Sequence, residues 1–205
     1  LTRALNLFIL TTTLNLLGAD PLVATISIVA RDPLTGEIGV AVQSKFVAVG
    51  SVVPYAEAGV GAIASQALGN VRYGPIGLKL LREGKSASEV VALMTQADPR
   101  QAHRQLGVIA PEGNSSIHTG IKCMEWAGGQ TGRNFAVQGN LLVGPEVIEA
   151  MAEGFKEANG TLSERMIGSL RAGQREGGDK RGRQSAALLV VRKGWGYGGL
   201  NDRFR

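Results

Sequence analysis

The sequence predicts an α+β protein folded as a four-layer αββα sandwich. Groups of strand-like segments alternate with two pairs of segments of helical period, an order that suits two sheets packed face to face with helices on both outer faces. Many of the 29 glycines lie in turns or beside small residues, which favours close contact between sheets. The 205 residues show no internal repeat and no linker, so we expect one domain over residues 25–205.

The first predicted strands form a hairpin. Residues 22–30 are rich in β-branched and apolar side chains, residues 31–36 carry turn signals, and residues 37–44 return as the second strand. A run of small apolar residues over 59–66 predicts a third strand.

Two helices are expected next, over residues 73–83 and 86–98. Ser86 and Glu89 have the spacing of a capping box at the start of the second helix, and Pro99 ends it. The first helix presents three apolar side chains on one side: Ile76, Leu80 and Leu81.

The second half of the chain repeats the order of strands, helices and strand. Patterns at 105–110 and 115–119 flank the turn residues 111–114 and predict a second hairpin. A strand, two amphipathic helices and a closing strand are expected over residues 135–142, 146–158, 162–172 and 185–191.

Residues 1–24 differ in composition from the rest. Arg3 precedes a mostly apolar run over residues 4–17, which is typical of a signal peptide and is too short for a membrane span. A signal peptidase would accept the small residues Ala19 or Ala24, and cleavage after Ala24 would make Thr25 the first residue of a mature chain without a membrane span. The protein would then be periplasmic or secreted. If the run is a leftover upstream segment, we expect a cytoplasmic protein.

Charge and cysteine content exclude several classes of protein. The formal net charge is +5, and the basic residues gather between Arg171 and Arg183 without interleaved aromatic residues, so we expect a loop beside an anionic-substrate pocket and no nucleic-acid partner. A single cysteine, Cys123, allows no intrachain disulfide and is more typical of a buried structural thiol than of a nucleophile. His103 and His118 form no cluster with metal-ligand spacing, so neither a metal nor another cofactor is expected.

Thr25 is the first candidate for a catalytic residue. A threonine at the start of a chain carries an attacking hydroxyl and an α-amine that can act as its base, because such an amine titrates near pH ~8. The alternative is an ordinary threonine of a strand. Ser27 shares the face of Thr25 by the two-residue period of a strand and is the competing candidate. If Thr25 does not become terminal, Ser27 is expected only as a hydrogen-bonding neighbour, because its amide nitrogen is not basic.

The second strand and a later turn supply neighbours for Thr25. Ser44 and Lys45 end a strand antiparallel to the first and therefore lie near its start; Lys45 is a catalytic candidate, with an exposed surface cation as the alternative. Asn140 follows Gly139 and could donate to an oxyanion, or could be a polar turn residue. Substrate contacts are expected from Ser27, Ser44, Gln66, Asn70, Asp179, Arg183 and Ser185. Arg183 would hold an acidic substrate group, unless it pairs with Asp179.

Several blocks of the sequence resemble the DUF1028 family of the N-terminal nucleophile hydrolase superfamily, and together they cover the chain from Ala24 to its end. The blocks lie at residues 27–33, 41–50, 126–128, 137–140 and 182–186. The resemblance implies an αββα fold and attack on an amide by the N-terminal residue. Proteasome-type members carry an acid where this chain has Gln43 and a lysine where it has Ala58 and Gly59. Family members usually continue past residue 203, so we expect this copy to be truncated.

The sequence therefore favours an amidohydrolase that cleaves a non-peptide or short acyl amide with Thr25 as nucleophile. The alternative is a binding or scaffold protein that has kept the fold and lost the chemistry. Four-layer hydrolases often associate, so we expect a homodimer.

Overall fold

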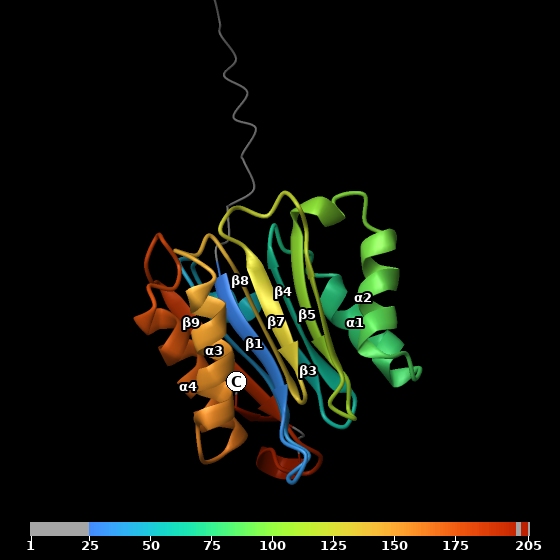
Figure 1. Cartoon of the computed structure of the whole chain (residues 1–205). Coiled ribbons are helices and arrows are strands. Elements are labelled where there is room, and N and C mark those ends of the chain that lie inside the picture. The colour runs from blue at the N-terminus through green and yellow to red at the C-terminus, as the bar shows by residue number, and fades with distance from the viewer. Residues whose placement is uncertain (1–24, 200–201, 205) are drawn as a thin grey trace, which may run out of the picture.

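Two antiparallel sheets form the centre of the molecule in the computed structural model, which describes residues 25–199 and 202–204 (Figure 1). The first sheet has six strands, in the order β10 (Asp202–Phe204), β9 (Ser185–Val191), β2 (Ile38–Ser44), β1 (Thr25–Arg31), β8 (Phe135–Asn140) and β7 (Gly128–Gly132). The second has four strands, in the order β3 (Pro54–Glu57), β4 (Gly61–Ala67), β5 (Arg104–Ile109) and β6 (Ser115–Thr119).

A pair of helices covers the outer face of each sheet (Figure 1). Helices α3 (Glu146–Glu157) and α4 (Leu162–Arg175) pack on the six-stranded sheet, and α1 (Tyr73–Arg82) and α2 (Ala87–Gln96) pack on the four-stranded sheet. Short 3₁₀ helices lie at Val49–Ser51, Gln101–His103 and Tyr197–Gly199. The predicted α+β class is confirmed.

Three apolar clusters correspond to the three spaces between layers. Met151 and Phe155 of α3 pack against β1 and β8, Val40 and Ala64 lie in the cluster between the sheets, and Met94 of α2 packs beneath the four-stranded sheet. The side chains of a strand alternate between its two faces. In β1, Ile26 and Ile28 therefore face α3 and α4, whereas Thr25, Ser27 and Val29 face the second sheet.

Most predicted elements are present within the described ranges, with ends that differ from the prediction by at most three residues. The hairpin strands of the second half and the closing strand are confirmed, as is the capping box of Ser86 and Glu89. Strands β3, β7 and β10 were not predicted, because they are short or rich in glycine and lack an apolar period. The expected apolar side of α1 is wrong at Ile76, whose side chain is 46% exposed. Leu81 is buried as predicted, and the helix also buries Tyr73, Gly74 and Gly77.

The predicted signal peptide, residues 1–24, lies outside the described residues. Within the described ranges, no helix is long and apolar enough to cross a membrane.

Candidate functional site

Thr25 opens β1 between two neighbouring strands. The register places it opposite Ser44 of β2 on one side and Asn140 of β8 on the other. The Oγ1 of Thr25 donates a hydrogen bond to Ser44 Oγ at 3.2 Å. All three residues are buried. The antiparallel pairing of β1 and β2 thus places Ser44 beside Thr25, as its position at the strand end predicts.

Two glutamines of the facing sheet complete the surroundings of Thr25. Gln66 of β4 donates from Nε2 to the Thr25 carbonyl oxygen at 3.3 Å and to Gln105 Oε1 at 2.8 Å. Gln105 of β5 also accepts a bond from Asn140 Nδ2 at 3.0 Å and donates to the Gly139 carbonyl oxygen at 2.8 Å. An amide nitrogen carries two hydrogens, so this geometry orients the Asn140 amide and leaves an N–H for a ligand oxygen.

Gln105 is a member of this polar network that the sequence reasoning missed. Its signal was a polar side chain at the start of the predicted strand 105–110, which is otherwise apolar. The residue has no exposed surface, and a buried amide is stable only where its donors and acceptors are paired.

Ser27 lies one step deeper in the same network. Its Oγ donates to Gln66 Oε1 at 2.5 Å and accepts from Gln138 Nε2 at 2.7 Å. The hydroxyl is buried and has both a donor and an acceptor as partners. These contacts describe a hydrogen-bonding neighbour of the Thr25 site.

The backbone is strained directly beside the network. Ala67 and Leu141 have positive φ values of 65° and 54°, and they immediately follow Gln66 and Asn140. The left-handed region is costly for residues other than glycine, and such residues gather at functional sites. Both strained residues line the same small hollow at the Thr25 end of the sheets.

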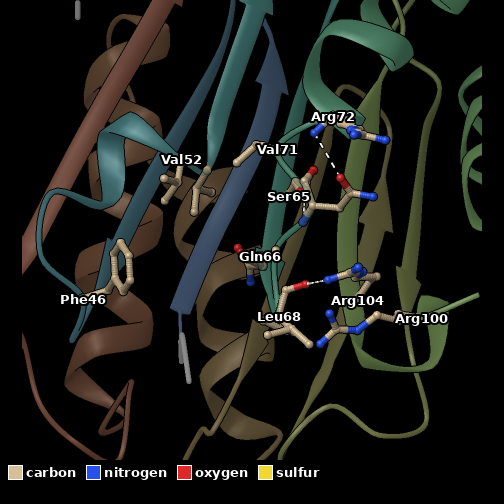
Figure 2. Close-up of a pocket in the computed structure, with 13 residues that line it drawn as sticks. Phe46, Val52, Ser65, Gln66, Leu68, Val71, Arg72, Arg100 and Arg104 are labelled. Carbon is tan, nitrogen blue, oxygen red and sulfur yellow. Dashed lines mark hydrogen bonds between the residues drawn. The ribbon is translucent and has the colours of Figure 1, made fainter. Parts of the chain in front are cut away.

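A cavity of about 360 Å³ lies on one side of this network (Figure 2). Phe46 and Val52, from the segment between β2 and β3, form one wall, and Arg72, Arg100 and Arg104 lie on the opposite side. Gln66, whose amide contacts Thr25, lines the cavity between these walls, together with Ser65, Leu68, Asn70 and Val71. The cavity therefore reaches the immediate surroundings of Thr25.

Asp98 holds the arginine side of this cavity in place. Its carboxylate accepts hydrogen bonds from Arg104 Nε at 2.9 Å, Tyr73 Oη at 3.0 Å, Asn70 Nδ2 at 3.1 Å and the backbone N–H of Arg100 at 2.8 Å. Burial alone would raise the pKa of Asp98, but these bonds outweigh it and hold the pKa well below its usual range. Burial, and then the bond to Asp98, raises the pKa of Tyr73.

Comparison with known proteins identifies the family of this chain. The chain matches a family of unknown function, DUF1028, over residues 25–202. The chain is a member of the DUF1028 family. The crystal structure of a DUF1028 protein from Silicibacter pomeroyi is similar to it, with 32% sequence identity and a TM-score of 0.79 over 84% of this chain and 78% of that chain. No curated protein matches the sequence.

In this DUF1028 protein, two of the residues predicted to contact substrate, Asp179 and Ser185, form hydrogen bonds with the loop that carries Phe46. Asp179 accepts from the backbone N–H of Lys45 at 3.1 Å, and Ser185 donates from Oγ to the Phe46 carbonyl oxygen at 2.6 Å. Ser185 also accepts from the backbone N–H of Val49 at 3.0 Å. Asp179 and Ser185 thus fix the loop through its backbone, and neither residue lines the cavity of about 360 Å³.

The side chains of Lys45 and Arg183 are not among the hydrogen-bonding partners found for Thr25, Gln66, Gln105 and Asn140 in the described ranges. The side chain of Lys45 is exposed, which agrees with the surface-cation alternative. Arg183 is also exposed and lines a different groove, beside α4, together with Arg171 and Arg175. Asp179 pairs with Arg181, whose Nη2 lies 3.0 Å from Oδ2, and not with Arg183.

A smaller hollow of about 70 Å³ lies on the Asn140 side of the network. Asn140, Ala67, Leu141 and Cys123 are among its lining residues. Burial raises the pKa of the Cys123 thiol, and the Sγ donates to the Arg104 carbonyl oxygen at 3.2 Å. A neutral, bonded thiol is a poor nucleophile, so Cys123 contributes packing here. In the described part of the chain, no three His, Cys, Asp or Glu side chains come together as metal ligands.

Proposed function

We propose that this DUF1028 protein is an N-terminal nucleophile hydrolase that cleaves a short acyl amide, with Thr25 as the first residue of the mature chain. The observation that carries the proposal is the hydrogen bond from Thr25 Oγ1 to Ser44 Oγ, at 3.2 Å. On the other side of Thr25, Asn140 of β8 is its partner in the strand register and has an oriented amide. The nearby cavity and the strained Ala67 and Leu141 support a site at this end of the sheets.

The proposed reaction begins with removal of residues 1–24. Cleavage of the bond between Ala24 and Thr25 creates an α-amine with a pKa near ~8, a sizeable fraction of which is neutral at pH 7 to 8. The side chains bonded to Thr25 in the described structure are a hydroxyl and an amide, Ser44 and Gln66, so proton acceptance falls to this amine. A predicted signal peptide over 1–24 would supply the cleavage and place the enzyme outside the cytoplasm.

In the first chemical step, the neutral amine accepts the proton of Thr25 Oγ1 while the oxygen attacks the carbonyl carbon of the substrate. The Asn140 amide donates to the oxyanion of the tetrahedral intermediate, a contribution of about 3 to 4 kcal/mol for a well-placed donor. The ammonium returns the proton to the leaving nitrogen as the C–N bond breaks. A water molecule, activated by the same amine, then hydrolyses the ester on Thr25 and releases the acid.

Two measurements test the proposal. The intact mass of protein expressed with residues 1–24 is expected to correspond to a chain that starts at Thr25. A β-lactone probe is then expected to acylate this chain at Thr25, with labelling lost in Thr25→Ala and kept in Thr25→Ser. Thr131→Ala, which removes an exposed hydroxyl on β7, serves as the matched control and is expected to label like the wild type.

A binding protein without catalysis is the second candidate function. It is favoured by the exposed position of Lys45 and by the complete burial of Thr25, whose hydroxyl already has a partner. A mature chain that retains Ala24, or equal labelling of wild type and Thr25→Ala, would overturn the hydrolase proposal and favour this second function.

A further inference from the structure

The charge of the cavity beside Thr25 is one-sided. Three arginines line it, Arg72, Arg100 and Arg104, and none of its lining residues is acidic. Arg104 is neutralised by Asp98, at 2.9 Å, and is buried. Arg72 is exposed, lines both this cavity and a neighbouring hollow that contains Asp98, and forms an ion pair with no acidic side chain in the described ranges. A ligand in this cavity therefore meets an excess of positive charge.

The segment that carries Arg72 is held rigidly. The backbone N–H of Arg72 donates to Asn70 Oδ1 at 3.1 Å (Figure 2), and the Asn70 amide donates in turn to Asp98 at 3.1 Å. Ser65 Oγ donates to the Asn70 carbonyl oxygen at 3.0 Å and accepts the Asn70 backbone N–H at 3.2 Å. The backbone under the guanidinium is thus preorganised, which lowers the cost of ordering a ligand against it.

The opposite wall has a different chemistry. Phe46 and Val52 present apolar surface to the cavity, and Leu68 and Val71 extend that surface beside the arginines (Figure 2). Ser185 and Asp179 fix the loop that carries Phe46, so this wall is also built into the fold. The cavity therefore combines an apolar wall with a guanidinium that can bind a carboxylate in a bidentate manner.

We propose that the substrate is an N-acyl amino acid, whose carboxylate binds Arg72 and whose apolar portion packs against Phe46 and Val52. This inference rests on the proposed function, which places the amide bond of the substrate at Thr25. An N-acyl amino acid has such an amide bond, and it also has an anionic group and an apolar group that could occupy the adjoining cavity. It moves the recognition of the acidic group from Arg183 to Arg72. The two arginines line different hollows.

The test uses N-hexanoyl-L-leucine and its uncharged C-terminal amide as probes. Binding to mature Thr25→Ala protein is measured by titration calorimetry, so that no turnover interferes. The carboxylate probe is expected to bind at least tenfold more tightly than the amide, and Arg72→Gln in the same background is expected to remove that preference. Arg133→Gln, which removes an exposed arginine at the β7–β8 turn, is the matched control and is expected to keep it. The melting temperature of each variant establishes that it is folded.

The outcomes separate this inference from the proposed function. Equal binding of both probes, no binding of either, or a preference that survives Arg72→Gln would overturn the inference. Carboxylate binding that depends on Arg72, without hydrolysis by the wild type, would keep the N-acyl amino acid as a ligand of the cavity and refute the hydrolase. Hydrolysis of uncharged amides that is indifferent to Arg72→Gln would keep the hydrolase and refute this choice of substrate.

Discussion

The buried ion pair of Asp98 and Arg104 offers a quantitative test of how the cavity is held. The two side chains are 8% and 10% exposed, and the Arg104 Nε lies 2.9 Å from Asp98 Oδ2. Asp98→Asn keeps the shape of the side chain and removes its charge. The variant leaves Arg104 buried without a counter-charge. It also turns an NH₂ group toward one set of hydrogen-bond donors, because Tyr73 and Asn70 bond to the same oxygen as Arg104.

The expected loss of stability follows from these contacts. Removing one partner of a buried ion pair typically costs about 3 to 5 kcal/mol. For a domain of this size each kcal/mol lowers the melting temperature by about 2 to 4 °C, so Asp98→Asn is expected to lower it by roughly 6 to 20 °C. Calorimetry of the wild type and the variant at pH 7 measures this shift.

The exposed pair of Arg82 and Glu57 provides the matched control. Its members also form a close ion pair, but their side chains are 54% and 36% exposed. Exposed pairs contribute little to stability, so Glu57→Gln is expected to leave the melting temperature nearly unchanged. If Asp98→Asn behaves like Glu57→Gln, Asp98 does not hold the arginine side of the cavity, and the backbone at Arg72 is not preorganised through Asp98.

Three further predictions concern the same structure. Because the folded pKa of Asp98 is depressed below the unfolded value of about 3.9, its stabilising effect is complete above that value and is lost as the pH falls through the folded pKa. Urea unfolding between pH 6 and 3 is therefore expected to show a decline that Asp98→Asn flattens. Cys123, the single cysteine, is expected to resist a disulfide reagent at pH 7.5 until the protein is denatured, because it is buried and its pKa is raised. Gly107→Ala is expected to destabilise the fold by about 1 to 3 kcal/mol, since its new Cβ would meet the Gln138 side chain; a neutral effect in a melting experiment would show that the sheets can separate locally.

Much of the fold could be predicted from the sequence, because periodicity and capping are local signals. The capping box at Ser86 and the closing strand 185–191 both depend on residues that are neighbours in the chain. The buried face of α1 could not be predicted in this way. Gly74 and Gly77 face inward because Tyr55 and Ile63 of the adjoining sheet occupy the space beside them, and that contact joins distant parts of the sequence.

In the candidate site too, the residues placed by strand pairing could be predicted, and those placed by contacts between distant segments could not. Ser44 and Asn140 could be placed near Thr25, since strand pairing follows from the hairpin and from the strand end at residue 140. Gln105 was missed, because its role depends on the packing of one sheet on the other. Arg72 was missed because a basic residue at the start of a helix has no local feature that relates it to Thr25.

The distribution of polarity between the sheets supports the proposal that the Thr25 end of the molecule is a functional site. Toward the opposite end of β1 and its neighbours, the space between the sheets is filled by apolar side chains such as Val29, Val40 and Ile109. At the Thr25 end the same space holds Gln66 and Gln105, both buried, although apolar residues of similar size would avoid the cost of burying amides. Sequences that depart from the stable local choice do so most often at functional sites. Here the buried amides coincide with two strained residues, Ala67 and Leu141, and with the cavity that Arg72 lines. A purely structural network requires neither the strain nor the cavity.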